Sequence, residues 1–153
     1  MSESRRISVR AAGNSDLNAV ARVWHESASR MDGALTDLPT RSALRERIDS
    51  ELQSGWDLYV ALEEGHVVGM LALKPAAAIL DQIFVAPTAQ GKGVGRMLLD
   101  LAKQLMAAGF TLRMDAANDR ARRFYEAGGM KKLGAGIHPW TGVPVHFYGW
   151  NVR

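Results

Sequence analysis

A glycine-rich turn between an apolar run and a strongly amphipathic segment constrains this chain more than any other feature. Apolar residues over 94–105 recur at i, i+3, i+4, i+7, i+8 and i+11, which predicts a helix with one buried face that ends at Gly109. The apolar run over 77–85 is stopped by Pro87 and predicts a buried strand. The turn that joins them holds three glycines in five positions, Gly91, Gly93 and Gly95.

The rest of the chain alternates between strand-like and helical patterns. We expect helices over 17–31, 44–52, 94–105 and 121–127, and strands over 5–11, 56–62, 66–74, 77–85, 110–114, 130–135 and 145–152. The order β-α-α-β-β-β-α-β-α-β-β is typical of a mixed α/β domain. A helical crossover makes the strands on either side of the 94–105 helix parallel, whereas hairpins make the earlier strands antiparallel.

Composition indicates a globular protein. The length of 153 residues predicts one domain over 1–153, and 47% hydrophobic with 23% charged residues excludes a disordered or collagen-like chain. Cysteine is absent, which excludes disulfides, thiolate metal sites and a cysteine nucleophile. No apolar run approaches the ~20 residues that span a bilayer, and the first residues do not resemble a signal peptide. We therefore expect a cytoplasmic protein that does not bind membranes.

Positive charge is concentrated in one part of the chain. The formal net charge is +3, and residues 90–132 carry nine Lys or Arg against four Asp or Glu, a balance of +5 that leaves −2 elsewhere. This distribution suggests an anionic ligand, with a solvated helix face as the alternative. A nucleic-acid binder is disfavoured, because basic residues are not interleaved with aromatic ones.

The glycine-rich turn over 90–96 has the properties of a phosphate site. Glycines allow positive φ and a close approach of the backbone, and free N–H groups at a helix start attract anions. Lys92 and Arg96 add positive charge. Gly93 follows Lys92 where a Walker A motif needs Ser or Thr, and the third glycine comes one residue too early for a dinucleotide fingerprint. A turn that uses its glycines only for packing remains the alternative.

Two segments resemble the GNAT family of N-acetyltransferases. Residues 85–95 are similar to its acyl-CoA signature, a strand with an aliphatic end followed by Gln/Arg-x-x-Gly-x-Gly/Ala, with Gln90, Gly93 and Gly95 at those positions. Residues 121–130 resemble its Ala-x-x-Phe-Tyr-x-x-x-Gly-Phe box, with Met130 in place of the aromatic residue. The resemblance implies a mixed, mostly antiparallel sheet of six or seven strands, with a central, splayed parallel pair flanked by helices.

The resemblance also implies an activity, the transfer of an acetyl group from acetyl-CoA to an amine. Backbone N–H groups of the turn would hold the pyrophosphate, and backbone groups of 83–85 would pair with the pantetheine arm. The N–H near Val85 would stabilise the tetrahedral oxyanion. The cofactor-binding residues implied in this way are Ile83, Phe84, Val85, Gln90, Gly91, Lys92, Gly93, Val94, Gly95, Arg96, Asn118 and Tyr125.

Two side chains are the candidate catalytic residues. A tyrosine with a pKa near 10 is protonated at neutral pH, so Tyr125 is the candidate acid for the departing thiolate, and a purely packed aromatic is the alternative. Asp81 lies among apolar residues and is the candidate base for the amine, with an ion-pair partner of an arginine as its alternative role. Asn118 is either a contact of the coenzyme arm, a helix N-cap, or both.

Two loops, 28–40 and 136–144, are expected to select the acceptor. Aromatic residues that could form a wall for an amine, although core packing is their alternative role, are Trp24, Trp56, Tyr59 and Trp140. Acidic residues that could attract a cation are Glu26, Asp32 and Asp37. The histidines have no metal-ligand spacing, so we expect no metal; they are His25, His66, His138 and His146.

The sequence leaves the acceptor open. A small-molecule amine is favoured, and a peptide N-terminus or a protein lysine is the alternative. An acyl-CoA sensor without catalysis is a further possibility, which the presence of Tyr125 disfavours. Edge strands near the C-terminus commonly pair in the family that the chain resembles, so a homodimer is plausible.

Overall fold

A computed structural model describes residues 6–29 and 39–152. Its helices are α1 (Leu17–Ala28), α2 (Arg41–Gln53), α3 (Val94–Leu105) and α4 (Asp119–Ala127). Its strands are β1 (Ile7–Ala11), β2 (Asp57–Glu63), β3 (His66–Lys74), β4 (Ile79–Val85), β5 (Phe110–Asp115), β6 (Lys131–Ile137) and β7 (Pro144–Trp150). The predicted order of helices and strands is confirmed. The predicted end of the first helix, Met31, lies outside the described residues.

The start of β4 differs from the prediction. The strand begins at Ile79 rather than at residue 77, because Pro75–Ala77 form a 3-10 turn and Ala78 has a positive φ of 55°. Proline at the first position of this turn removes a donor and ends β3. This turn lets the chain reverse between two antiparallel strands.

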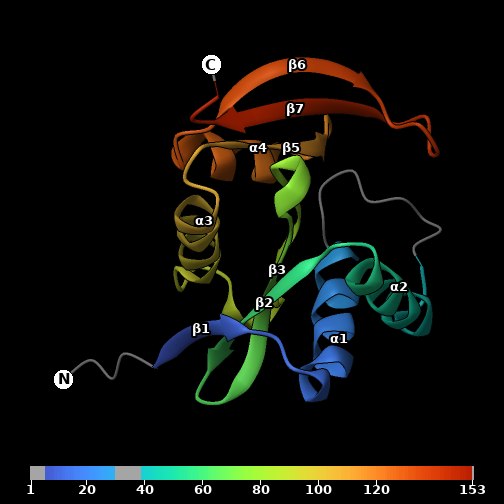
Figure 1. Cartoon of the computed structure of the whole chain (residues 1–153), viewed down its shortest axis with the longest axis vertical. Coiled ribbons are helices and arrows are strands. Elements are labelled where there is room, and N and C mark those ends of the chain that lie inside the picture. Colours follow the sequence, from blue (N-terminus) through green and yellow to red (C-terminus); the bar gives the residue numbers. More distant parts are fainter. Residues whose placement is uncertain (1–5, 30–38, 153) are drawn as a thin grey trace.

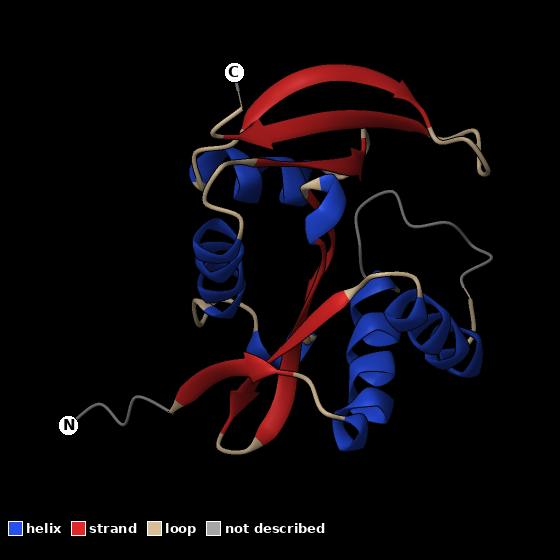
Figure 2. Cartoon of the chain, viewed as in Figure 1, coloured by secondary structure: helices blue, strands red, loops and turns tan. Residues whose placement is uncertain are grey.

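The strands form one seven-stranded sheet in the order β1-β2-β3-β4-β5-β7-β6 (Figures 1 and 2). Each neighbouring pair is antiparallel except β4 and β5, which are parallel across the α3 crossover. The mixed, mostly antiparallel sheet with a central parallel pair is therefore confirmed.

The parallel pair is splayed. β4 pairs with β3 from Lys74 opposite Ile79 to Gly69 opposite Val85, with one irregularity between Ala72 and Leu73. With β5 it shares one register pair, Ile79 with Thr111. Beyond that point the two strands separate, so the edge of β4 that faces β5 has no strand partner.

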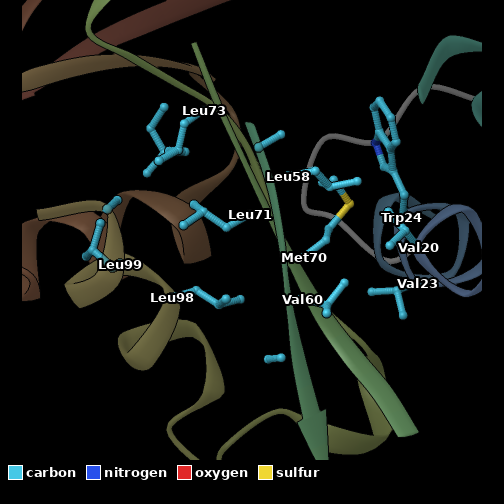
Figure 3. Packing of buried hydrophobic residues seen from close by; sticks show 14 of the residues in the cluster. Val20, Val23, Trp24, Leu58, Val60, Met70, Leu71, Leu73, Leu98 and Leu99 are labelled. Atoms are coloured by element: carbon cyan, nitrogen blue, oxygen red, sulfur yellow. The ribbon is translucent and has the colours of Figure 1, made fainter. Parts of the chain in front are cut away.

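Helices cover both faces of the sheet. In Figure 1, α1 and α2 lie on one side of the central strands and α3 with α4 on the other. Figure 3 shows the resulting core: Leu71 of β3 points toward Leu98 on α3, and Met70 points to the opposite side, toward Val23 on α1. All four side chains are fully buried, and this alternation fixes which residues of each central strand face which helical layer.

The described helices have between 9 and 13 residues. In the part of the chain that the structure describes, no helix is long and apolar enough to cross a membrane.

Gly109, directly before β5, packs tightly against the backbone at the end of β7. Its φ is +116°, and an added Cβ would lie 2.5 Å from the carbonyl oxygen of Asn151 after β7. Gly129 also has a positive φ but has open space around it. We expect Gly129→Ala to lower the free energy of unfolding by about 1 kcal/mol and Gly109→Ala by about 3 kcal/mol, because only the latter adds a clash. Equilibrium unfolding in urea measures both; equal losses would contradict this packing.

Candidate active site

A cavity of about 890 Å³ lies where β4 and β5 separate. We call it the central cavity. Strand residues of β4 and β5, the glycine-rich turn, α4 and the loop between β6 and β7 line it. Every candidate site residue except Lys92 is among its lining residues, namely Asp81, Ile83, Phe84, Val85, Gln90, Gly91, Gly93, Val94, Gly95, Arg96, Asn118 and Tyr125.

The glycine-rich turn presents a row of backbone donors to the central cavity. Gly91 and Gly93 both have φ of +82°, a conformation that glycine adopts at no steric cost. The first hydrogen bond of α3 runs from the Met97 N–H to the Gly93 carbonyl, at 3.0 Å. The N–H groups of residues 91–96 make no backbone hydrogen bond within the described chain. Six successive donors at a helix N-terminus form a strong site for an anion.

The two basic side chains of the turn have different surroundings. Lys92 Nζ lies 3.1 Å from Glu63 Oε2 on β2, and the lysine does not line the central cavity. Arg96 lines the cavity, and its one ion pair with a described residue is an exposed contact with Asp100, at 3.3 Å. The side chain of Lys92 is thus paired away from the cavity, whereas that of Arg96 lines the cavity beside the turn.

The free edge of β4 offers backbone groups to the central cavity. The Ala86 N–H donates to the Val68 carbonyl of β3 at 2.7 Å. Because backbone groups alternate in direction along a strand, Phe84 also faces β3, whereas Ile83 and Val85 direct their N–H and C=O groups toward the gap between β4 and β5. The geometry thus leaves Ile83 and Val85 for a ligand that pairs with this edge.

A serine that sequence patterns did not single out holds the end of β4. Ser27 on α1 is buried, and its hydroxyl donates to the Val85 carbonyl at 2.8 Å. Its one signal in the sequence is a small polar residue on the apolar face of α1. With that carbonyl occupied, the Val85 N–H is the donor that remains at this point of the edge.

Tyr125 lies on α4 among aromatic rings. Its ring centroid is 5.3 Å from that of Phe124 and 6.5 Å from that of Tyr148. The side chain is 8% exposed and lines the central cavity, and its hydroxyl makes no hydrogen bond to any described residue. Burial raises the pKa of Tyr125 far above its ordinary value of 10. The phenol is therefore a protonated donor across the whole physiological range.

Asp81 reaches the same cavity from the opposite face of the sheet. Ala72 pairs with Gln82 and Leu73 with Leu80, so Asp81 is the extra residue of a β-bulge. Its Oδ2 accepts a hydrogen bond of 2.8 Å from the indole N–H of Trp56 and lies 3.7 Å from Lys74 Nζ. The partners of Asp81 are thus a tryptophan and a lysine, and not the arginine considered as its alternative partner.

Asn118 caps α4. Its Oδ1 accepts the Ala121 N–H at 3.1 Å, and the residue is 5% exposed. The predicted capping role is confirmed. The side-chain NH₂ group is not used by the cap, so the same residue can also donate to a ligand in the central cavity, which it lines.

Comparison with known proteins identifies the fold and the family. The model of the acetyltransferase (GNAT) family matches residues 22–130, more than half of the chain. The chain belongs to this family. It is 30% identical to the uncharacterized N-acetyltransferase YhfO of Bacillus subtilis (strain 168), over 91% of the chain and 99% of that protein. It is 27% identical to the peptidyl-lysine N-acetyltransferase YjaB of Salmonella typhimurium, over 84% and 86%.

Solved GNAT structures share this architecture. The phosphinothricin acetyltransferase of Sinorhizobium meliloti, solved in complex with AcCoA, superposes with a TM-score of 0.72 at 19% identity, covering 94% of this chain and 87% of that one. At this identity the likeness shows the fold alone. The GNAT resemblance predicted from residues 85–95 and 121–130 is confirmed at the level of family and fold.

Three of the four aromatic residues proposed to form a wall for the acceptor lie outside the central cavity of this GNAT chain. Trp24 and Trp56 are 5% and 4% exposed and pack against each other in the core, with ring centroids 5.8 Å apart. Neither they nor Tyr59 line the central cavity. Trp140 does line it and is 84% exposed. Core packing explains the first three, and Trp140 remains a candidate contact.

The acidic residues and histidines considered in the sequence analysis are placed as follows relative to the central cavity. Glu26 pairs with Arg22 at 3.3 Å, and Asp32 and Asp37 lie outside the described residues, as does most of the 28–40 loop. Among the histidines, only His138 lines the central cavity. The described parts of the chain hold no cluster of three or more potential metal ligands.

Sequence patterns also missed the basic side chains of the cavity. Arg47 on α2, Lys74 on β3 and Arg113 on β5 line it together with Arg120. They are far apart in the sequence and belong to no motif, so only the folded chain brings them together.

Proposed function

We propose that this GNAT chain is a single acyltransferase domain that moves an acetyl group from acetyl-CoA to the primary amine of a small molecule. The observation that carries the proposal is the central cavity, which the donors of the glycine-rich turn, the free edge of β4 and the Tyr125 hydroxyl all adjoin. Acetyl-CoA is further supported by the structural neighbour from Sinorhizobium meliloti that was solved with AcCoA.

Binding of acetyl-CoA would depend mainly on backbone groups. The unpaired N–H groups of residues 91–96 are suited to the pyrophosphate, with Arg96 beside them. The pantetheine arm contains amides, which can pair with Ile83 and Val85 as an added strand would. The thioester then lies at the end of β4, where the Val85 N–H can donate to the oxyanion that forms during attack.

The reaction is a direct attack of the neutral amine on the thioester carbon. A C–N bond forms, the carbonyl becomes a tetrahedral oxyanion, and the C–S bond then breaks. Tyr125 donates its proton to the sulfur as that bond breaks, so that CoA leaves as a thiol, and the phenol regains a proton from solvent afterwards. Burial raises the pKa of Tyr125, so the phenol holds its proton before the reaction. Desolvation therefore keeps the acid in its proton-bearing form.

Asp81 would accept the proton that the amine loses, directly or through water. It enters the cavity from the α1 face, whereas Tyr125 enters from the α4 face. The two groups can therefore act on opposite sides of the reacting carbon. The Trp56 N–H and Lys74 hold the carboxylate in one orientation.

A second class of acceptor is a lysine of a protein, since the YjaB relative from Salmonella typhimurium is a peptidyl-lysine N-acetyltransferase. To distinguish the two classes, the protein is incubated with acetyl-CoA and either free amines or lysine-containing peptides. Mass spectrometry then shows which of them is acetylated.

Acetyl-CoA should stabilise the folded chain. At 100 times its Kd a ligand adds about 2.7 kcal/mol, which for a chain of this size raises Tm by roughly 5–10 °C. We expect this shift with acetyl-CoA and none with ATP, because the turn lacks a Walker A motif. Differential scanning fluorimetry makes the measurement. No shift at millimolar acetyl-CoA would reject both the transferase and the acyl-CoA sensor.

Tyr125→Phe should lower turnover by at least about tenfold and leave acetyl-CoA affinity unchanged, because it removes the acid and keeps the ring. The matched control is Tyr148→Phe, which removes the neighbouring hydroxyl that donates to Glu126 outside the cavity. Thiol release measures turnover, and the Tm shift reports binding. Equal turnover in Tyr125→Phe and wild type would exclude Tyr125 as the acid.

Asp81→Asn should remove the acid limb of the pH–rate profile, because an amide does not titrate. The substitution keeps an oxygen that can accept the Trp56 N–H, so the fold is expected to persist. Asp49→Asn, at an exposed ion pair on α2, is the control. A profile with the same acid limb as wild type would assign the base to another group.

A further inference from the structure

We propose that the acceptor is an amino acid with an apolar side chain, whose carboxylate is bound by Arg47 and Arg113 while its amine faces Asp81. The inference rests on the proposed acetyl transfer and names its substrate class. It is drawn from the basic side chains of the central cavity, for which binding of acetyl-CoA at the glycine-rich turn supplies no role.

Arg113 lies across the cavity from the proposed base. Thr111 of β5 is in register with Ile79 of β4, and Arg113 and Asp81 each follow that pair by two residues, so both lie near the start of the gap and line the cavity. Arg113 is exposed, whereas its neighbours Leu112 and Met114 are buried on the other face of β5. An amine held near Asp81 therefore has a guanidinium on the opposite wall.

Arg47 approaches the same region from α2. Its guanidinium carbon lies 5.1 Å from the centroid of the Trp24 ring, which is fixed in the core. Both Arg47 and Arg113 act electrostatically on His138, a cavity residue of the β6–β7 loop, and Arg113 Nη2 lies 3.3 Å from its Nε2. The pKa of His138 is lowered, first by burial and then by Arg113. Both arginines line the central cavity, and Arg113 contacts His138 there.

Neither guanidinium has a carboxylate within hydrogen-bond distance among the described residues. Arg47 forms a long ion pair of 3.7 Å with Glu51, and the side-chain partner of Arg113 within the described residues is the His138 ring, at 3.3 Å. By contrast, Arg10 and Arg45 bind carboxylates at 2.6 and 2.7 Å. A guanidinium that lines a cavity and is not held bidentately by a protein carboxylate offers the planar donor arrangement that a ligand carboxylate fits.

The charges of the cavity match a zwitterion. Asp81 and Asp115 line it together with the basic residues, so it presents negative as well as positive groups. An amino acid places its ammonium and its carboxylate on one carbon, and it can satisfy both kinds of group at once. A simple amine would leave the Arg113 guanidinium without a carboxylate partner when bound water is displaced, which costs free energy.

Exposed aromatic residues adjoin the guanidiniums and indicate an apolar side chain. Phe147 on β7 is the register partner of Arg113, is 38% exposed and lines the central cavity. Trp140 also lines it, and its backbone N–H donates to His138 Nδ1 at 3.2 Å. Large apolar groups exposed inside a cavity are stabilised when a ligand covers them.

The test compares amino acids with their decarboxylated amines. L-phenylalanine, L-leucine and L-methionine are each assayed beside 2-phenylethylamine, 3-methylbutylamine and 3-(methylthio)propylamine, with thiol release for rate and mass spectrometry for product. A bidentate pair with a charged group is worth about 10- to 100-fold in affinity, so we expect at least one acid to exceed its amine by that factor in kcat/KM.

Arg47→Gln and Arg113→Gln locate the carboxylate site. We expect each to raise KM for the preferred acid about tenfold or more with little change in kcat, and to leave KM for the amine unchanged. Arg45→Gln is the matched control, because Arg45 lies on the same helix, binds Asp49 and Asn18, and does not line the cavity. The acetyl-CoA Tm shift is expected to be the same in all three variants.

The outcomes separate this inference from the function on which it rests. If amines are acetylated as well as or better than their acids, if no acid is acetylated, or if both arginine variants match the control, the amino-acid acceptor is overturned while acetyl-CoA binding stands. If the wild-type chain shows no shift with acetyl-CoA, the proposed function fails and the acceptor assignment fails with it.

Discussion

The separation of β4 from β5 is the constraint on which the rest of the structure depends. Each of these strands is paired on its outer side, β4 with β3 and β5 with β7, yet they share one register pair, Ile79 with Thr111. Backbone polar groups inside a protein need partners, so a free strand edge in the middle of a sheet is maintained for a ligand or for water. The central cavity follows directly from this geometry.

Packing on both faces keeps the strands apart. On one face α3 approaches β3 so closely that a Cβ on Gly69 would lie 3.1 Å from Val94 and Leu98, which fixes the helix start beside the end of β4. On the other face the buried Ser27 hydroxyl holds the Val85 carbonyl. The donor turn and the strand edge are thereby positioned by the core rather than by the ligand.

The anion site shows where local sequence is informative. The six unpaired N–H groups come from a continuous segment, so glycine spacing and the helix start predict them. The side chain of Lys92, which adjoins those glycines, pairs with Glu63, 29 residues away. Spacing along a turn fixes backbone direction and cannot reveal a long-range ion pair.

The sequence by itself determined the order of the elements, the parallel crossover, the glycine-rich turn, the aromatic pair on α4 and the family, because each of these is written in periodicity or in a continuous motif. Only the tertiary structure decided that β5 pairs with β7 rather than β6, that Trp24 and Trp56 belong to the core, and that Asp81 sits in a bulge bound by an indole. It also gathered Arg47 and Arg113 from separate elements. These features depend on contacts between residues distant in the chain, and no local pattern carries such contacts.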